Sequence, residues 1–236
     1  MKKYKILFLD VDGTLLDFKK TERYALAHTF QKFAIDFNDE IRARYSKINH
    51  GLWEAYERGE IEKATIFSTR FTRLFDEMGF EADGMEVEKE YQYQLAHTWF
   101  YMEDCMEVLE RLHQKYRLYI VTNGVSSTQH TKLALSGIDV LVDGIFISEE
   151  IGVQKPKKEF FDYCASHVPD YEKDAVLIVG DSLTSDIRGG NLAGIDTCYL
   201  HVEEKTGEKE QDCRQGEFRI TYEISSLKEL AELLDA

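Results

Sequence analysis

The chain has 236 residues, of which 43% are hydrophobic and 31% are charged. This length and composition are typical of a globular protein with a substantial apolar core, built as one large domain or as a domain that carries a smaller insertion. Its 44 acidic side chains outnumber its 29 lysines and arginines, which gives a formal net charge of −15 at pH 7. Such a surface repels polyanions, so we expect no nucleic acid polymer as a partner.

The sequence also lacks the patterns of an exported or membrane-bound protein. The apolar run near the N-terminus is too short for a secretory signal, because Asp10 and Asp12 interrupt it, and no segment approaches the length of a membrane span. We therefore expect a cytoplasmic protein with no membrane partner, and a monomer is the simplest expectation. The cysteines show no C-x-x-C spacing and are expected to be reduced; they are Cys105, Cys164, Cys198 and Cys213.

The first predicted element is a buried strand at residues 4–9, which ends at the turn Asp12-Gly13-Thr14. No convincing strand follows between residues 21 and 97. Helical periodicity and glycine stops predict four helices in this stretch instead. They cover residues 22–37, 39–57, 63–78 and 85–97.

From residue 104 onward the predicted elements alternate between helix and strand. Strands are expected at residues 118–121, 145–147, 176–179 and 197–200, and helices at residues 104–115, 126–135, 157–167, 183–192 and 225–234. Such alternation predicts an α/β fold, a Rossmann-like parallel sheet with helices on both faces. The all-helical stretch is then an insertion, so we expect a core domain at residues 1–17 and 93–236 and an α-helical cap domain at residues 18–92.

Reactive or polar residues follow four of the predicted strands. The carboxyl ends of parallel strands lie along one edge of a sheet, and ligands bind there at the point where the strand order reverses. We therefore expect these residues to form one site. In chain order they are Asp10-Val11-Asp12-Gly13-Thr14, Thr122-Asn123-Gly124, Lys155-Pro156 and Gly180-Asp181, with Asp186 beyond.

The aspartates of this edge predict a metal ion. Carboxylates that crowd together repel one another and are costly to bury without a cation. Magnesium prefers oxygen ligands and is commonly held by one or two carboxylates together with water and substrate phosphate. A Mg²⁺ site formed by Asp10, Asp181, a backbone carbonyl and water would fit this sequence.

The four motifs together resemble the haloacid dehalogenase (HAD) superfamily of phosphohydrolases. D-x-D-G-T, an apolar run that ends in T-N-G, K-P and G-D-x-x-x-x-D occur here in the order of that superfamily, over nearly the whole chain. Any one of them alone is a weak signal, since D-G-T is usually only a turn. The set implies the HAD fold and a Mg²⁺-dependent phosphatase that acts on a small phosphate ester.

The resemblance also implies catalytic and metal-binding roles. Asp10 would attack phosphorus and form an aspartyl phosphate. Asp12 would protonate the leaving oxygen and then activate a water molecule. The carboxylates of Asp10 and Asp181, with the backbone carbonyl of Asp12, would hold the Mg²⁺.

Four further residues acquire roles from the same resemblance. Thr122 and the amide of Asn123 would hydrogen-bond phosphoryl oxygens, and Lys155 would balance the charge of nucleophile and phosphate. Asp186 would orient the site from behind the metal ligands. A plain first-turn position in a helix, where negative charge is favoured, explains Asp186 equally well.

The sequence also bears on other activities found among proteins of this fold, which are alternatives to a phosphatase. Dehalogenases of the superfamily lack the second aspartate, because no leaving oxygen needs a proton, so Asp12 argues against carbon–halogen chemistry. A phosphonatase would need a Schiff-base lysine, and neither Lys47 nor Lys63 stands in such a context. A phosphomutase and a broad-specificity sugar-phosphate or phosphoglycolate phosphatase remain open. A non-enzymatic, phosphate-sensing interaction protein on the same scaffold is disfavoured, because the key groups of all four motifs are present.

The predicted cap resembles that of bacterial pyrimidine 5'-nucleotidases of this superfamily in residues 49–59 and Arg70-Phe71. Residues 147–156, in the expected core domain, resemble those enzymes as well. This resemblance implies removal of the 5'-phosphate from pyrimidine nucleoside monophosphates, with Trp53 and Tyr56 offering a ring face to the base. Aromatic residues at helical spacing are more often the packed core of a helical domain, so that alternative stays open.

Overall fold

The computed structural model describes residues 4–201 and 218–235 and contains two compact units. The α/β unit consists of Met1–Asp17, Tyr101–Ser126 and Leu133–Ala236. The helical unit consists of Phe18–Phe100 and Ser127–Lys132. Three cysteines, Cys105, Cys164 and Cys198, are buried and free, whereas Cys213 lies outside the described residues.

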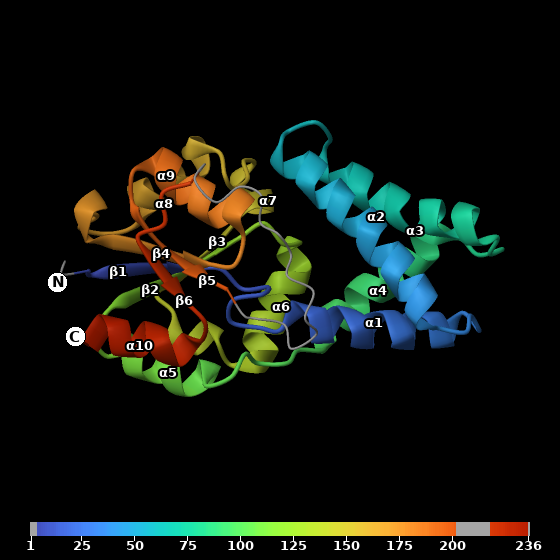
Figure 1. Cartoon of the computed structure of the whole chain (residues 1–236), viewed down its shortest axis with the longest axis horizontal. Coiled ribbons are helices and arrows are strands. Elements are labelled where there is room, and N and C mark those ends of the chain that lie inside the picture. Colours follow the sequence, from blue (N-terminus) through green and yellow to red (C-terminus); the bar gives the residue numbers. More distant parts are fainter. Residues whose placement is uncertain (1–3, 202–217, 236) are drawn as a thin grey trace. The chain divides into compact units, whose positions relative to one another are not determined.

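The sheet of the α/β unit contains, within the described residues, six strands in the order β3-β2-β1-β4-β5-β6 (Figure 1). Every neighbouring pair is parallel. The strands are β1 (Ile6–Leu9), β2 (Arg117–Thr122), β3 (Gly144–Ile147), β4 (Val176–Gly180), β5 (Asp196–Leu200) and β6 (Tyr222–Ile224).

Helices cover both faces of this sheet, with α8 and α9 on one side and α5 and α10 on the other (Figure 1). The α/β Rossmann-like fold class predicted from the sequence is therefore confirmed. The helices are α5 (Cys105–His113), α6 (Ser126–Ser136), α7 (Ser148–Ile151), α8 (Lys158–His167), α9 (Arg188–Ala193) and α10 (Leu227–Asp235). Short turns form η1 (Asp139–Leu141), η2 (Lys173–Ala175) and η3 (Leu183–Ile187), the last of which is π-helical.

The central strands are buried on both faces, which explains their continuous apolar sequences. Phe8 and Ile178 belong to a core cluster that also contains Phe161 of α8. Their strand neighbours Leu7 and Leu177 are equally inaccessible to solvent. Because successive side chains of a strand point to opposite faces, both faces of β1 and β4 must be covered.

The strand order reverses next to β1. From β1 the chain continues to β2 on one side, whereas β4 pairs with β1 on the other side. The two strand ends are joined by a hydrogen bond in which the Asp10 backbone N–H donates to the Val179 carbonyl at 3.0 Å. The crevice at such a reversal is the usual ligand position in open α/β sheets.

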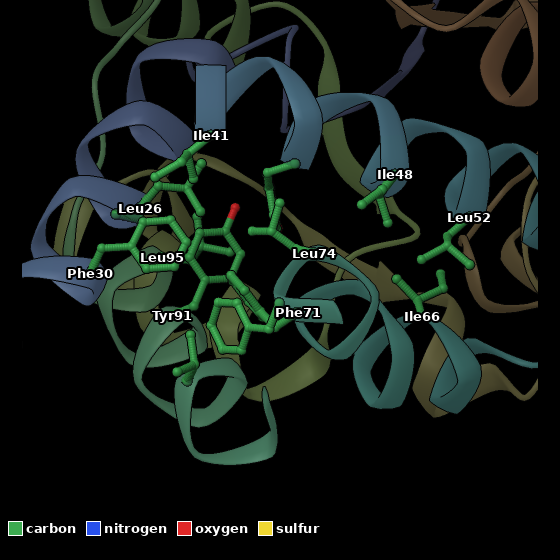
Figure 2. Close-up of a cluster of buried hydrophobic side chains, with 14 of the residues drawn as sticks. Leu26, Phe30, Ile41, Ile48, Leu52, Ile66, Phe71, Leu74, Tyr91 and Leu95 are labelled. Carbon is green, nitrogen blue, oxygen red and sulfur yellow. The ribbon is translucent and has the colours of Figure 1, made fainter. Parts of the chain in front are cut away.

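The helical unit is built from four helices, α1 (Phe18–Lys32), α2 (Asp39–Glu57), α3 (Lys63–Met78) and α4 (Gly84–His97). Helix α3 packs against both α2 and α4, and α4 also packs against α1. Their apolar stripes meet in one core, in which Phe30, Ile48, Phe71 and Tyr91 represent the four helices (Figure 2). The apolar core of this unit is separate from the core that packs against the sheet.

The structure differs from the sequence-based elements mainly where an element is short. Strand β6 has three residues and α7 has four, and neither was predicted, because so few residues show no usable periodicity. The first helix of the insertion was expected at residues 22–37, but α1 ends at Lys32, and Ala34 beyond it adopts a φ of 54°.

The helical unit extends further than the expected cap at residues 18–92. That expected end falls inside α4, which continues to His97. Residues Ser127–Lys132 of α6 also group with this unit, and the Thr128 hydroxyl donates to Oε1 of Gln92 at 2.9 Å. None of the helices in residues 4–201 and 218–235 has the length and apolarity needed to cross a membrane.

Candidate active site

The loop after β1 presents Asp10, and the carbonyl group of Val11 accepts most of the backbone hydrogen bonds within it. The backbone N–H groups of Thr14, Leu15 and Leu16 all donate to the carbonyl oxygen of Val11, at 3.3, 3.0 and 2.9 Å. The loop therefore folds back on itself directly after the strand. Asp10 is 8% exposed at the start of this turn, so the residue is largely shielded from solvent.

Gly13 brings this loop against the loop after β4. Its φ of +101° lies in the left-handed region that side chains disfavour, and a Cβ there would meet Oδ2 of Asp181 at 2.1 Å. The Thr14 hydroxyl donates to Oδ1 of Asp181 at 3.4 Å. The D-x-D-G-T motif thus needs its glycine for both the turn and the approach of Asp181.

Lys155 lies at the centre of the site and is only 1% exposed. Its ammonium group donates to Oδ1 of Asp10 at 2.7 Å, to Oδ1 of Asp186 at 2.6 Å and to the carbonyl of Val121 at 2.8 Å. Three acceptors match the three protons of an ammonium group, so the lysine is fully bonded without substrate.

Asp186 lies in the π-helical turn η3, an element that often occurs at functional sites. One carboxylate oxygen accepts from Lys155 and the other accepts from the Ser182 backbone N–H at 3.1 Å. A Cβ at Gly180 would meet this carboxylate at 2.2 Å, which explains the glycine before Asp181. Asp186 is fully buried and its two oxygens hold Lys155 and the loop in place.

The electrostatics of the site are unbalanced toward negative charge. Oxygens of Asp10, Asp181 and Asp186 lie within 4.8 Å of one another, and Lys155 is the cation bonded among them. Burial raises the pKa of Asp10 well above its ordinary value; Lys155 opposes this rise, and the charges of Asp186 and Asp181 add to it. Burial, reinforced by the charge of Asp186, raises the pKa of Asp181 to about 7.

The same charges act on the lysine in the opposite sense. Burial by itself lowers the pKa of Lys155, but the nearby charges of Asp10 and Asp186 outweigh burial and leave the pKa raised. Lys155 therefore stays protonated, while the raised pKa values of Asp10 and Asp181 oppose their ionisation. A second cation at this place would favour the charged forms of these two carboxylates.

The donor set fits a divalent cation with oxygen ligands. Asp186 has both oxygens engaged, so Asp10 and Asp181 are the carboxylates of the cluster that are best placed to bind a metal. Hard oxygen donors and partial burial are what Mg²⁺ or a similar ion prefers. Asp12 is half-buried and forms a backbone bridge with Leu16, and its carboxylate is not part of this three-aspartate cluster.

The structure gives Thr122 and Asn123 unequal positions. Thr122, at the end of β2, is 2% exposed, and its hydroxyl oxygen accepts from the Gly124 backbone N–H at 3.0 Å. The side-chain amide of Asn123 bonds to the backbone of Lys155 through both its nitrogen and its oxygen, each at 3.0 Å. The backbone N–H of Asn123 is therefore the better candidate for a contact with phosphoryl oxygen.

The aromatic residues predicted to contact a base lie in the helical unit. Tyr56 is 7% exposed and belongs to its apolar core, which fits the packing alternative. Trp53 is half-buried, packs against that core, and meets Tyr56 edge to face with ring centroids 5.8 Å apart. Of the two rings, Trp53 has the larger accessible surface.

Arg70 and Asn49, two other residues of the nucleotidase-like segments, take part in a buried polar network. Arg70 is 2% exposed and donates to both carboxylate oxygens of Glu88, at 2.6 and 2.7 Å. It also donates to Oδ1 of Asn49 at 3.0 Å, while the Asn49 amide donates to Glu22 at 3.2 Å. Arg70 thus connects α3 to α4 and α2. Its hydrogen bonds to Glu88 and Asn49 indicate a structural role within the helical unit.

The sequence placed Thr14 at the site without a role, and it did not predict two further contributors. Thr14 bonds to Asp181, the Val121 carbonyl accepts from Lys155, and the Ser182 backbone N–H donates to Asp186. Thr14 stands inside a recognised motif, so its proximity was a usable signal. Val121 and Ser182 act through backbone groups, which every residue type except proline has, so their identity in the sequence gives no signal.

Comparison with known proteins gives an independent view of the same chain. The haloacid dehalogenase-like hydrolase family matches residues 4–194. The chain is 40% identical to the HAD-hydrolase YfnB of Bacillus subtilis, over 100% of this chain and 97% of that protein. It is 35% identical to the pyrimidine 5'-nucleotidase PynA of Streptococcus pneumoniae (98% and 95% covered) and 30% identical to the pyrimidine 5'-nucleotidase YjjG of Escherichia coli (98% of each covered).

Solved structures agree with this assignment. The crystal structure of magnesium-bound YfnB superposes with a TM-score of 0.89 at 40% identity, over 100% of both chains. The L-2-haloacid dehalogenase of Xanthobacter autotrophicus superposes with a TM-score of 0.74 over 99% of both chains, but at 15% identity it shows the fold alone. The family match, the relatives that align over nearly their whole length and the strand-end aspartates lead to one conclusion: this chain belongs to the haloacid dehalogenase-like hydrolases.

Proposed function

We propose that the protein is a Mg²⁺-dependent phosphatase that hydrolyses the 5'-phosphate of pyrimidine nucleoside monophosphates through an aspartyl phosphate at Asp10. The observation that carries the proposal is the arrangement of Asp10, which is buried at a strand end, bonded to Lys155 and within 4.8 Å of Asp181. A nucleophilic carboxylate, a fixed ammonium group and a place for a cation are the parts that phosphoryl transfer requires.

In the first step a carboxylate oxygen of Asp10 bonds to phosphorus while the bond from phosphorus to the ester oxygen breaks. Asp12 gives its proton to that leaving oxygen, which departs as the nucleoside hydroxyl. In the second step Asp12 takes a proton from water, and the water oxygen attacks phosphorus. Orthophosphate leaves and the Asp10 carboxylate is restored.

The remaining residues position and neutralise the phosphoryl group. Lys155 holds Asp10 in one orientation and offsets part of the negative charge. We assign the Thr122 hydroxyl and the backbone N–H of Asn123 to phosphoryl oxygens, and Asp186 to the placement of Lys155. Mg²⁺, held by Asp10, Asp181 and the carbonyl of Asp12, would supply the additional positive charge that neutralises the phosphate.

The choice of substrate rests on similarity to two nucleotidases. PynA and YjjG carry the pyrimidine 5'-nucleotidase name and align with this chain over almost their full lengths. The helical unit contributes Trp53, a half-buried ring on which a pyrimidine base could stack. Other phosphatases, such as a phosphoserine phosphatase of Thermus thermophilus at 27% identity, keep a different phosphate ester open as a second candidate.

The deciding experiment is a comparison of phosphate release from one panel of esters with Mg²⁺ present or chelated. The panel contains pyrimidine and purine nucleoside monophosphates, sugar phosphates, phosphoserine and phosphoglycolate. We expect kcat/KM to be highest for pyrimidine monophosphates and activity to disappear with chelator. Trp53→Ala should then raise KM for the nucleotides and leave sugar phosphates unchanged, with the exposed Tyr93→Ala as its control.

Each other outcome rejects a defined part of the proposal. A preference for sugar phosphates or phosphoserine rejects the nucleotidase assignment and keeps the phosphatase. Full activity in chelator rejects the metal. No hydrolysis of any ester rejects the phosphatase and favours a phosphate-sensing protein on the same fold.

A further inference from the structure

The side-chain amide of Asn123 is bonded to a single other residue, Lys155, on both sides of that residue's backbone. Nδ2 of Asn123 donates to the Lys155 carbonyl at 3.0 Å, and the Lys155 N–H donates to Oδ1 of Asn123 at 3.0 Å. A primary amide can donate and accept at once, and here both functions serve one peptide segment. We call this pair of hydrogen bonds the Asn123 clamp.

The clamp joins two loops that are far apart in the sequence. Asn123 follows β2, whereas Lys155 lies 32 residues later, between α7 and α8. No strand pairing extends to Lys155, since β3 ends at Ile147. The backbone of Lys155 is thus attached to the end of β2 by a side chain.

The other end of Lys155 is attached to the same place. Its ammonium group donates to the carbonyl of Val121, two residues before Asn123, as well as to Asp10 and Asp186. One strand end therefore fixes the lysine at its backbone and at its charged tip. A long, flexible side chain that is held at both ends has few accessible rotamers, so its ammonium group keeps a defined position.

We propose that Asn123 is a positioning residue for Lys155, and that its side chain acts on the reaction through the lysine rather than by touching the phosphoryl group. The inference rests on the proposed phosphatase function for its kinetic consequence, but its geometric part does not. The Asn123 amide gives its oxygen and one N–H of Nδ2 to the Lys155 backbone, and these two bonds fix the plane of the amide against that segment.

The chain contains a matched control for the clamp. Asn191 makes the same two bonds to another backbone: Nδ2 donates to the Arg219 carbonyl at 2.8 Å, and the Arg219 N–H donates to Oδ1 at 2.8 Å. The Arg219 carbonyl also accepts from the Thr197 hydroxyl at 3.0 Å, so this backbone belongs to a different part of the same unit, and Asn191→Ala removes an equivalent pair of bonds at a position that does not hold Lys155.

The test is a double-mutant cycle on the full-length enzyme with Asn123→Ala, Lys155→Met and the double variant. We expect Asn123→Ala to lower kcat by about 10- to 100-fold with little change in KM, because a small displacement of a positioned group costs that much. In the Lys155→Met background the same substitution should cost less than about 2-fold, since there is no ammonium group left to place. Asn191→Ala should melt at a similarly reduced temperature with wild-type kcat.

Two results would overturn the proposal. If the effects of Asn123→Ala and Lys155→Met multiply, Asn123 acts on the substrate independently of the lysine. If Asn123→Ala keeps wild-type kcat, like Asn191→Ala, the clamp contributes stability alone. Should Asn123→Ala not fold, Asn123→Asp takes its place in the cycle, because a carboxylate still accepts from the Lys155 N–H while the bond to its carbonyl is lost.

A spectroscopic measurement separates this proposal from the proposed function. In protein labelled with ¹⁵N-lysine, the ammonium signal of Lys155, assigned by its loss in Lys155→Met, should shift in Asn123→Ala and stay fixed in Asn191→Ala. If the wild type hydrolyses no ester, the proposed function fails and this signal alone decides the clamp. An unmoved signal in Asn123→Ala rejects it whatever the activity.

Discussion

Asp10 combines properties that separate a nucleophile from an ordinary surface aspartate. It is buried, it accepts a hydrogen bond from Lys155, and its pKa is raised, first by burial and then, against the opposing effect of Lys155, by Asp186 and Asp181. Strongly perturbed carboxyl groups in a crevice are characteristic of functional sites. These properties are consistent with the role of nucleophile that we propose for Asp10.

Replacing this one oxygen nucleophile should remove turnover without unfolding the protein. We expect Asp10→Asn to lower kcat by more than about 10³-fold, because the amide cannot form the aspartyl phosphate. The amide has almost the same shape, and it removes one of three crowded carboxylates, so stability should hold or rise. Phosphate release measures the rate and circular dichroism the fold. Asp162→Asn, on an exposed helix position, should keep the wild-type rate. A wild-type rate in Asp10→Asn would rule out the covalent route.

At the scale of the elements, the loop after β1 shows how backbone conformation positions the site. Val11 accepts three backbone N–H groups, and Gly13 supplies a positive φ where the loop approaches Asp181. Neither feature adds a reactive atom. Together they place the carboxylates of two different strand ends close enough to share a cation.

A methyl group at Gly13 should therefore damage metal binding more than stability. A Cβ at that position would overlap Oδ2 of Asp181 at 2.1 Å, so Gly13→Ala should weaken Mg²⁺ binding at least ~10-fold, the usual lower range for a displaced ligand support. Titration calorimetry measures the dissociation constant. Gly137→Ala is the matched control, since it has a φ of +72° in the same unit and open space around its Cβ. Equal affinity in both variants would mean that the loop adjusts freely.

The helices of the second unit are tied together by Arg70. Its guanidinium group bonds to Glu88 of α4 and Asn49 of α2, and it lies 4.8 Å from the centre of the Tyr91 ring. Removal of one partner of a buried ion pair leaves the other charge uncompensated. The interaction is therefore one of the places where this unit is most sensitive to substitution.

Arg70→Ala should destabilise the protein by about 3–5 kcal/mol, the usual effect of breaking a buried ion pair. Denaturant unfolding followed by circular dichroism measures the loss. Arg58→Ala, which removes an exposed arginine paired with Glu60, should change little. If Arg70→Ala unfolds at the same denaturant concentration as Arg58→Ala, the network contributes no net stability.

At the scale of the whole molecule, the buried aspartate cluster links the free energy of unfolding to pH and would link it to metal binding. The pKa of Asp181 is raised from 3.8 to about 7, chiefly by burial. Between these values the folded, metal-free protein binds more protons than the unfolded chain, so its free energy of unfolding falls as pH rises. A metal ion that binds the ionised carboxylates counters this loss and releases protons.

The Tm increase on adding Mg²⁺ should therefore be larger near pH 8, above the pKa of about 7 for Asp181, than near pH 5.5, below it. Thermal unfolding at fixed Mg²⁺ concentration measures both increments. Asp181→Asn should abolish most of the difference, because the titrating ligand is gone. An increment that is the same at both pH values would contradict metal binding at this cluster.

The sequence by itself was sufficient for the alternation of strands and helices, the helical insertion and the four motifs that meet at one edge of the sheet. These features are local, because continuous apolar runs, glycine stops and short motifs are legible within a few residues. Such local patterns could predict the family, and the match to residues 4–194 confirms it. They could not predict β6, since three residues become a strand only through pairing with β5.

Other features were decided by tertiary structure alone. The direction of the Asn123 side chain, the attachment of Lys155 to Val121 and the burial of Arg70 and Tyr56 all depend on groups that are distant in the chain. Residue identity gives an asparagine its donor and acceptor but not its partner, because packing selects among many partners of similar energy. For this protein, the sequence determined which reactive groups meet at the strand ends, and the packed structure decided which of them are bonded to one another.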